Sequence, residues 1–293
     1  MRSAVIGAGV VGRATGIGLQ MYGYEVIFYD VNPEKTAELE KQGFKVARSV
    51  KEAVRWSDIS FVCVQTPYVD SRVDLSYLKS AIMSIGESLD GENYHVVAVR
   101  STVPPFTTRN IVIPLLQECS GLRVGKDFGV CFNPEFLREA SALQDFLSPA
   151  RIVIGEVDKK AGDILEELYK PFKAPIIRTN PETAEVIKYV ANTFLATKIS
   201  FFNEVYLLCA KLGLDPNLVA ETVALDPRIG KYGIYGGRPF GGSCLPKDLK
   251  TFIQFFRENG VEPTLLSAVL AVNEKMEEIQ KRREMSERDK CLQ

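Results

Sequence analysis

The segment GGSCLPKD, residues 241–248, carries a cysteine, a lysine and an aspartate behind a pair of glycines. Pro246 favours a helix that starts just after Cys244. The positive end of that helix and the nearby Lys247 would stabilise the thiolate form of the cysteine, which is a strong nucleophile. Asp248 falls in the first turn of the same helix, close enough to act with Cys244 as an acid or base. The segment therefore predicts covalent catalysis through a cysteine.

The same segment also has a purely structural interpretation, in which Cys244 is a buried thiol and Asp248 caps a helix. That interpretation leaves the glycines and the proline around the cysteine unexplained. Gly241 would leave room for a substrate against the backbone. The glycine-rich loop before it carries Tyr235 and Phe240, and this loop could fold over a ligand.

A second set of polar residues interrupts a long apolar helix. Residues 181–213 begin with proline, end with glycine and contain neither in between, which predicts one helix. It is apolar nearly all round, so we expect it to be buried. Glu185, Lys188, Asn192 and Asn203 follow one another at spacings of 3, 4 and 11, which places them on one face. Either this face is a solvated edge, or Lys188 and Asn192 face a cleft.

The N-terminal residues form an apolar strand, a glycine turn, a helix and a second strand that ends at Asp30. The turn, GAGVVG, has glycines at positions 7, 9 and 12. Gly7 would make the tight turn, Gly9 would let the backbone approach a pyrophosphate, and Gly12 would let the helix pack closely on the strand. The first N–H groups of the helix would then bind the phosphates.

Asp30 would accept hydrogen bonds from the hydroxyls of an adenosine ribose. Its charge would repel a 2′-phosphate, so the sequence favours NAD over NADP. The structural alternatives are a glycine turn without a ligand and an aspartate that only ends a strand.

Strands and helices continue to alternate beyond Asp30. We predict further strands at residues 59–67, 95–105, 128–136, 151–156 and 174–179, and a helix at 74–88. This order is typical of an α/β protein with a doubly wound parallel sheet of the Rossmann type, whose ligands lie outside the carboxyl ends of the strands. The residues at such ends are Thr66, Pro67, Ser101, Thr102, Asn133 and Glu135.

The segment NPEFLRE, residues 133–139, overlaps the end of the predicted strand 128–136. Asn133 is expected to cap a helix that Pro134 opens. Glu135 and Glu139 would then share a face one turn apart. Favourable charge at a helix N-terminus is the structural alternative for both carboxylates.

The last third of the chain is predicted to be helical. Besides the long helix, we expect helices at residues 214–225, 248–259 and 263–285. We therefore expect an NAD-binding domain at residues 1–180 and an all-α domain, used for dimerisation, at residues 181–293.

Composition excludes several other classes of protein. The chain has 293 residues, with 37 acidic and 36 basic side chains and a net charge of −1, which argues against binding nucleic acid or an anionic membrane surface. No apolar run is long enough to span a membrane, and the N-terminus is expected to be a strand rather than a signal peptide. Six scattered cysteines and one histidine predict no metal site. Mostly buried, reduced thiols favour the cytoplasm.

Taken together, these motifs resemble the nucleotide-sugar 6-dehydrogenases, which act on UDP-glucose, GDP-mannose and UDP-N-acetylmannosamine. The matching segments, in family order, are GAGVVG with Asp30, CVQTP, RSTVPP, FNPEFLREASALQDFLSPARIVIG, EVIKYVANTFLATKISFFNEV, DPRIG and FGGSCLPKD. The resemblance implies oxidation of the carbon-6 alcohol to a carboxylate with two NAD in succession, with UDP-glucose as the first choice of substrate. It also implies a homodimer formed through the helical domain.

By this resemblance, Cys244 attacks the bound aldehyde to give a thiohemiacetal, which becomes a thioester that water hydrolyses. Asp248 would be the acid or base that orients the water, and Lys188 and Asn192 would stabilise the oxyanion at carbon 6. This agrees with the chemistry, because a thioester route needs a thiolate, an oxyanion cation and a water-activating carboxylate.

The resemblance assigns further roles. Glu139 would lie near the catalytic water, Thr102 would contact cofactor and water, and Arg228 would reach a neighbour's substrate across the dimer. The residues expected at the cofactor are Gly7, Gly9, Val10, Val11, Asp30, Lys35, Thr66, Pro67, Ser101, Thr102, Glu135 and Lys247. The residues expected at the substrate are Glu135, Phe136, Leu137, Lys188, Asn192, Arg228, Tyr235, Phe240 and Gly241.

The chain also departs from the family pattern. Tyr235 stands where several UDP-glucose enzymes have a lysine that contacts the nucleotide. The family has a third domain of roughly a hundred residues or more, and this chain ends where that domain would begin. A fragment and a naturally short form are both open. Two other functions remain as alternatives: a two-electron β-hydroxyacid-type dehydrogenase, and an NAD-binding dimer without catalytic activity.

Overall fold

In the computed structural model, the structure describes the backbone of residues 1–291 and the side chains of residues 1–285. The chain divides into two compact units, Met1–Lys188 and Tyr189–Gln293. The division falls inside one long helix, so this helix begins in the first unit and continues in the second.

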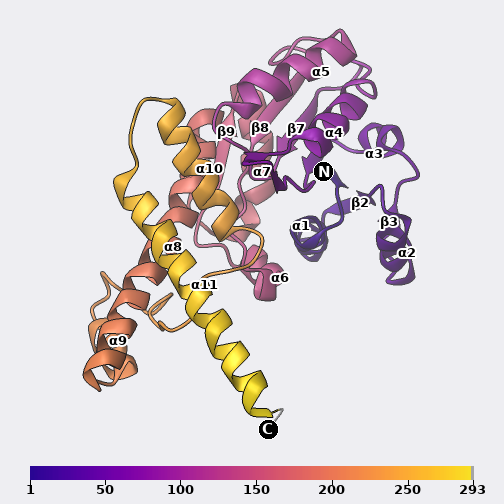
Figure 1. Cartoon of the computed structure of the whole chain (residues 1–293). Helices are drawn as coiled ribbons and strands as arrows, with labels where there is room; N and C mark the ends of the chain where they lie inside the picture. The colour runs from indigo at the N-terminus through magenta and orange to yellow at the C-terminus, as the bar shows by residue number, and fades with distance from the viewer. Residues whose placement is uncertain (292–293) are drawn as a thin grey trace. The chain divides into compact units, whose positions relative to one another are not determined.

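An eight-stranded sheet forms the centre of the first unit (Figure 1). In spatial order its strands are β10 (Ile176–Thr179), β9 (Ile152–Glu156), β8 (Phe128–Phe132), β7 (His95–Val99), β4 (Ile59–Val62), β1 (Arg2–Ile6), β2 (Glu25–Tyr29) and β3 (Lys45–Val46). All neighbours are parallel except β8 and β9, which are antiparallel. The predicted α/β doubly wound fold is confirmed. Because β9 and β10 run in the opposite direction, only the other six strands end at the edge where ligands bind in such sheets.

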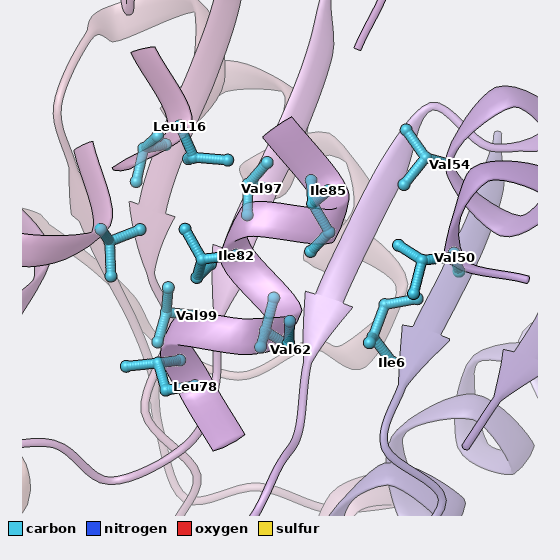
Figure 2. Close-up of a cluster of buried hydrophobic side chains, with 14 of the residues drawn as sticks. Ile6, Val50, Val54, Val62, Leu78, Ile82, Ile85, Val97, Val99 and Leu116 are labelled. Carbon is cyan, nitrogen blue, oxygen red and sulfur yellow. The ribbon is translucent and has the colours of Figure 1, made fainter. Parts of the chain in front are cut away.

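Helices cover both faces of this sheet because its strands are apolar on both sides. On one face pack α3 (Val50–Trp56), α4 (Ser76–Gly86) and α5 (Ile113–Ser120). On the other pack α1 (Val10–Met21), α6 (Ala142–Leu147) and α7 (Lys159–Tyr169). Figure 2 shows the first face, where Leu78, Ile82 and Ile85 of α4 lie over Val97 and Val99 of β7. Each such buried side chain contributes roughly 1.5–3 kcal/mol of hydrophobic free energy.

The remaining elements of the first unit are short. The helix α2 (Pro33–Lys41) precedes β3, and a small hairpin joins β5 (Tyr68–Val69) to β6 (Arg72–Val73). A π-helix, η1 (Thr108–Val112), leads into α5, and two 3₁₀ turns lie at η2 (Glu139–Ser141) and η3 (Lys170–Phe172).

The long predicted helix is present as α8 (Pro181–Leu212). In the second unit it is followed by α9 (Pro216–Val223), α10 (Leu245–Glu258) and α11 (Thr264–Cys291), as predicted. The core of this unit contains Ala196 of α8, Leu249 and Ile253 of α10, Val269 of α11, and Phe240 from the loop between α9 and α10.

The prediction that α8 is buried all round is wrong for one of its faces. Val190, Phe194, Phe201, Leu208 and Leu212 are between 50% and 66% exposed. Their spacings of 4, 7, 7 and 4 place them on one side of the helix. No described element of the second unit packs over them, so an apolar stripe, defined here by these five residues, faces outward.

Two absences follow from the described part of the chain. None of its helices has the length and apolar character that crossing a membrane requires. Within the same residues, no group of three metal-ligating side chains lies together.

The cysteines at positions 63, 131 and 209 are buried, Cys119 is half-buried and Cys244 is exposed. The side chain of Cys291 lies outside the described residues.

Candidate active site

The glycine turn after β1 has the geometry that dinucleotide binding requires. Gly7 has φ = +103°, and a Cβ there would lie 2.6 Å from the carbonyl oxygen of Cys63. A Cβ on Gly12 would lie 1.8 Å from the carbonyl oxygen of Gly7. A Cβ on Gly9 would meet nothing within 4 Å. Packing within the protein therefore requires glycine at positions 7 and 12. Gly9 instead borders open space that a pyrophosphate could approach.

The N-terminus of α1 is suited to an anion. Gly9 is its N-cap and has no side chain to bind the first amides of the helix. Val10, in the first turn, is 48% exposed. The N–H groups near Val10 and Val11 thus lack a side-chain cap in the described structure, and such groups bind phosphates well.

Asp30 lies directly after β2 and is held beside the glycine turn. Its Oδ2 accepts the N–H of Ala8 at 2.7 Å, and its Oδ1 accepts the N–H of Asn32 at 2.9 Å. The ammonium of Lys35 lies 3.6 Å from Oδ2. Because each carboxylate oxygen can accept a second hydrogen bond, Asp30 retains the capacity to bind ribose hydroxyls. These residues fit an NAD molecule.

The loops after β4 and β7 are joined by hydroxyl groups. Thr66 donates from Oγ1 to the carbonyl of Thr102 at 2.8 Å, and Ser101 donates from Oγ to the carbonyl of Val64 at 2.5 Å. Both hydroxyl hydrogens are thereby committed to the protein. Thr66 and Ser101 can offer only oxygen lone pairs and backbone groups to a cofactor, and their first role is to hold the two loops together.

A buried guanidinium that the sequence did not single out lies at the end of β7. Arg100 is 5% exposed. It donates to Oγ1 of Thr15 at 2.9 Å, to Oδ1 of Asn133 at 2.6 Å and to the hydroxyl of Tyr169 at 3.2 Å. A buried charge must be satisfied by such acceptors, and this need recruits Asn133.

The prediction of a helix opened by Pro134 is therefore wrong. Asn133 uses its amide to bind Arg100 and to donate to the carbonyl of Val153 at 2.8 Å, so it caps no helix. Residues 133–138 have no regular structure. Glu135 is buried and Glu139 is exposed at the start of η2, so the two carboxylates do not share a helix face.

Glu135 forms a buried ion pair with Lys188. The Nζ of Lys188 donates to Oε1 of Glu135 at 2.8 Å and to its carbonyl at 2.7 Å, while the N–H of Leu137 donates to Oε2 at 2.6 Å. Burial alone would raise the pKa of Glu135. The charge and hydrogen bond of Lys188, with smaller contributions from Leu137 and Arg100, outweigh burial and lower it. The same ammonium lies 5.5 Å from the ring centre of Phe136.

Glu185, one turn earlier on α8, binds the loop after β7. Its carboxylate accepts hydrogen bonds from the N–H of Phe106 at 2.5 Å and from the N–H of Thr108 at 2.8 Å. Thr108 is the first residue of η1, and Phe106 lies two residues before it. Burial raises the pKa of Glu185 to about 7, although hydrogen bonds from Thr108 and Phe106 act in the opposite direction. The four polar residues predicted to share one face of α8 are all buried, so the interpretation of this face as a solvated edge is wrong. Glu185, Lys188, Asn192 and Asn203 are at most 8% exposed.

In the second unit, Asp248 is 1% exposed and paired with two side chains. Asn192 donates from Nδ2 to its Oδ2 at 2.6 Å, and Lys247 donates from Nζ to its Oδ1 at 2.7 Å. Neither oxygen binds the first amides of α10, whose N-cap is Cys244 without a side-chain hydrogen bond. The alternative of a helix-capping acid is therefore wrong.

Cys244 is exposed at the N-terminus of α10, as the proline after it predicted. The alternative of a buried structural thiol is wrong. Its Sγ lies 3.6 Å from Oγ of Ser243, and its carbonyl accepts the N–H of Asp248 at 2.8 Å. Within the second unit, the thiol and the buried carboxylate thus share the first turn of one helix.

Other predicted residues lie apart from these clusters. Glu139 and Arg228 are exposed, and Arg228 pairs with Asp226 beside it. Tyr235 is 59% exposed and donates its hydroxyl to Oε1 of Glu221 at 3.0 Å, which raises the pKa of that hydroxyl. None of the three forms a hydrogen bond with the buried pairs in the described structure. Their predicted contacts with substrate remain predictions.

Sequence reasoning missed Asn273 and Lys198 of the second unit. Asn273 binds the backbone of Phe240, and Lys198 binds two carbonyls of the loop after α9. A signal existed for Asn273, because it interrupts the apolar run AVLAVNEKM as Asn192 interrupts α8. Phe240 itself is buried, while Gly241 is exposed.

Comparison with known proteins gives a consistent classification. The NAD binding domain of the UDP-glucose/GDP-mannose dehydrogenase family matches residues 36–173, and the central domain of the same family matches residues 182–275. Among curated proteins, GDP-mannose 6-dehydrogenase of Pseudomonas aeruginosa is 38% identical over 93% of this chain and 68% of its own length. UDP-glucose 6-dehydrogenase TuaD of Bacillus subtilis is 40% identical over 93% of this chain and 62% of its own length.

Solved structures agree. A UDP-glucose dehydrogenase from the archaeon Pyrobaculum islandicum has 40% identity and a TM-score of 0.88, covering 94% of this chain and 68% of that one. A UDP-D-ManNAc dehydrogenase from Pyrococcus horikoshii has 32% identity and a TM-score of 0.82, covering 94% and 69%.

This chain thus spans 62% to 69% of the length of these relatives. The matched NAD binding domain confirms the predicted cofactor, and the relatives' names confirm the predicted class of oxidoreductase. On this evidence, the chain belongs to the UDP-glucose/GDP-mannose dehydrogenase family.

Proposed function

We propose that this protein oxidises the carbon-6 alcohol of a nucleotide sugar to a carboxylate, with UDP-glucose as the first choice of substrate. The observation that carries the proposal is the first turn of α10. There an exposed thiol, Cys244, and a buried carboxylate, Asp248, share one turn, and Asn192 and Lys247 hold the carboxylate. A two-electron alcohol oxidation needs no thiol, whereas oxidation to the acid uses one to hold the aldehyde.

Cys244 is the proposed nucleophile. Its thiolate attacks carbon 6 of the aldehyde, a C–S bond forms, and the carbonyl oxygen becomes the oxyanion of a thiohemiacetal. NAD, which the glycine turn and Asp30 would hold, would supply the oxidising chemistry as a hydride acceptor used twice. The alcohol would lose a hydride from carbon 6 and its hydroxyl proton to water, and the thiohemiacetal oxyanion would lose a hydride from carbon 6 to leave a thioester. Water then cleaves the C–S bond and releases the carboxylate and the thiolate.

Lys188 is the proposed cation for the oxyanion. A lysine ammonium has three N–H donors. Lys188 uses two of them on Glu135, one on a carboxylate oxygen and one on the carbonyl. One donor is left for a developing negative charge, and burial makes such an interaction stronger than it would be in water.

Asp248 is the proposed base for hydrolysis of the thioester. Each of its oxygens accepts one hydrogen bond, from Asn192 and from Lys247, so each has a lone pair left for water. Asn192 likewise has a second N–H to donate, which supports the predicted role at the oxyanion.

There are two main candidates for the substrate of the proposed reaction, UDP-glucose and GDP-mannose. UDP-glucose is supported by the relatives from B. subtilis and P. islandicum, which are named for it and are 40% identical to this chain. GDP-mannose is supported by the P. aeruginosa relative at 38% identity. Tyr235, where several UDP-glucose enzymes have a nucleotide-binding lysine, favours testing both.

The decisive experiment offers UDP-glucose, GDP-mannose and UDP-N-acetylmannosamine with NAD and counts NADH per uronic acid. We expect two NADH per acid formed, and a loss of turnover of at least about a thousandfold in Cys244→Ala. Cys119→Ala is the matched control, because Cys119 is half-buried on α5 in the first unit. One NADH per turnover, or full activity of Cys244→Ala, would establish a two-electron dehydrogenase instead.

We further propose that the protein is a homodimer formed through α8. The apolar stripe of this helix extends from Val190 to Leu212, and each of its five side chains is at least half exposed. Large exposed apolar patches of this kind mark protein interfaces. A second copy is the occupant we favour, because an apolar stripe along one helix can pack against the same stripe of a second copy about a twofold axis. In such a dimer Arg228, which is exposed, would be free to contact the neighbour's substrate.

A further inference from the structure

The substrate segment, defined here as residues 226–243, joins α9 to α10 without a helix or strand. It carries the predicted substrate contacts Arg228, Tyr235 and Phe240. A segment of this length inside a compact unit must satisfy its backbone groups with side chains or water, and is otherwise mobile. Its partners in the second unit therefore decide whether it is a flexible lid or a fixed wall.

Asn203 of α8 binds the middle of the substrate segment. Its Oδ1 accepts the N–H of Gly237 at 2.8 Å, and its Nδ2 donates to the carbonyl of Arg238 at 2.9 Å. Asn203 is fully buried. The backbone lies directly against α8 at this point, since a Cβ on Gly236 would lie 2.4 Å from the carbonyl oxygen of Phe202.

Asn273 of α11 binds the segment again, closer to the thiol. Its Oδ1 accepts the N–H of Phe240 at 2.8 Å, and its Nδ2 donates to the carbonyl of Phe240 at 3.1 Å and to Glu277 at 3.2 Å. Asn273 is 2% exposed, and the ring of Phe240 is buried in the same core as Leu249. Backbone and side chain of Phe240 are thus both fixed, four residues before Cys244.

Lys198 of α8 holds the beginning of the segment. Its Nζ donates to the carbonyls of Ile229 at 2.6 Å and Gly230 at 2.9 Å, just after Arg228. Three side chains from two helices therefore bind the substrate segment at three successive points. At each point the side chain supplies the groups that a neighbouring strand or water would otherwise supply.

We propose that Asn203, Asn273 and Lys198 are positioning residues, which hold the substrate segment in its binding conformation before substrate arrives; this rests on the proposed function. An amide side chain donates from its nitrogen and accepts at its oxygen at the same time, so it can pair with both the N–H and the carbonyl of the backbone, which explains asparagine at the two buried points. Ordering the segment in advance removes the entropy cost of ordering it upon binding, so these residues raise affinity for the nucleotide sugar. They do not touch the reacting atoms.

The first test measures hydrogen exchange of peptides covering residues 234–243 in Asn203→Ala and Asn273→Ala. Each variant should speed exchange of its own amide, Gly237 or Phe240, by about tenfold or more. Ser200→Ala is the matched control. It removes a buried hydrogen bond from α8 to the carbonyl of Val269 on α11 at 3.1 Å, without touching the segment. This readout does not require activity.

The second test measures KM for the preferred nucleotide sugar and Kd for NAD in the same variants. We expect a rise of about tenfold or more in the sugar KM, a small change in kcat, and no change in Kd for NAD, because neither asparagine binds a residue expected at the cofactor. Asn273→Asp, which keeps the acceptor and loses the donor, should be intermediate or worse. Asn273→Ser serves where Asn273→Ala does not fold.

Three results would overturn the proposal. In one, the amides of Gly237 and Phe240 exchange at unprotected rates in the wild type. In another, Ser200→Ala raises the sugar KM as much as the asparagine variants do. In the third, the variants speed exchange without changing the sugar KM. A wild type that binds no nucleotide sugar would refute the proposed function, and the exchange comparison would then decide by itself whether the three side chains hold the segment.

Discussion

At the scale of single residues, the most consequential group is the ion pair of Lys188 with Glu135, whose side chains are 4% and 8% exposed. Such a pair is a weak source of stability, because both charges lose their hydration. Removing one partner is costly, however, since the other is then buried without compensation. The pair is better explained by function, as two hydrogen bonds hold the ammonium in one orientation in a dry environment.

This argument predicts the stability of Lys188→Met. Lys188 is the main group that lowers the pKa of Glu135 against burial, so that pKa should rise in the variant. We expect a loss of about 3–5 kcal/mol at pH 7, which shrinks as the pH falls and Glu135 becomes protonated. Urea unfolding at several pH values measures it. The double variant Lys188→Met with Glu135→Gln is the control and should recover most of the loss; no recovery would refute the coupling.

A second prediction at this scale concerns His95, the one histidine of the chain. Its Nδ1 lies 3.0 Å from the carbonyl of Ser57, so Nδ1 carries the hydrogen, and its Nε2 accepts the hydroxyl of Ser60 at 2.8 Å. Burial lowers the pKa of His95 to about 4, despite the hydrogen bond to Ser57. The folded state therefore holds the neutral ring, while the unfolded chain takes up a proton below about pH 6.5.

Stability should fall as the pH drops from about 6.5 to about 4, by about 3 kcal/mol from this group. Thermal or urea unfolding across this range measures the fall. His95→Gln, which does not titrate, should lower stability at pH 7 but flatten this part of the curve. An unchanged slope in the variant would mean that other groups, such as the carboxylates, cause the loss.

At the scale of elements, the glycine turn and α1 separate two uses of glycine. Gly12 lies where α1 crosses β1, and a Cβ there would collide with the carbonyl of Gly7. Gly9 lies at the open end of α1 and has room for a Cβ. The sequence motif treats both alike, whereas the structure assigns packing to one and access for a ligand to the other.

We therefore expect Gly12→Ala to lower the free energy of unfolding of the first unit by about 3 kcal/mol or more, because α1 and β1 must move apart. Gly9→Ala should leave the free energy of unfolding within about 0.5 kcal/mol and weaken NAD binding by about tenfold or more. Urea unfolding and calorimetric titration with NAD distinguish the two effects. A Gly9→Ala variant that unfolds as easily as Gly12→Ala would show that its role is also packing.

Elements also show how far local sequence carries a prediction. The strands β1 and β2, the glycine turn after β1 and the position of Asp30 directly after β2 were predicted correctly, because each depends on neighbours in the chain. The helix at Pro134 was not, because Asn133 is taken by Arg100, which lies 33 positions away. A capping residue is recognised by type, but type does not reveal which of two partners its side chain binds.

At the scale of the whole molecule, the apolar stripe of α8 needs an explanation, because its five side chains are exposed. Sequence alone indicated a helix that is apolar nearly all round, which fits burial within one chain and burial between two chains equally well. In the structure, Phe194, Phe201 and their neighbours are exposed, so the described residues do not bury them. The proposed dimer is the arrangement that would bury them.

Phe201→Glu should therefore dissociate the dimer, because it would bury two carboxylates near the twofold axis. Sedimentation equilibrium or light scattering measures the mass. Met83→Glu is the control, since Met83 is also an exposed apolar residue but lies on α4 in the first unit. A wild type that is monomeric at micromolar concentration would refute the dimer, and a Phe201→Glu variant that remains dimeric would place the interface elsewhere.

By itself, the sequence determined the alternation of strands and helices, the glycine turn with its acid, the four C-terminal helices and the position of Cys244 at a helix start. These features follow from periodicity, proline and glycine, which act over a few residues. Only the tertiary structure decided the partners of buried polar groups, such as Glu185 with the loop at Phe106 and Asn273 with Phe240. The physical reason is that a buried donor or acceptor must be paired, and packing selects its partner from segments far apart in the chain.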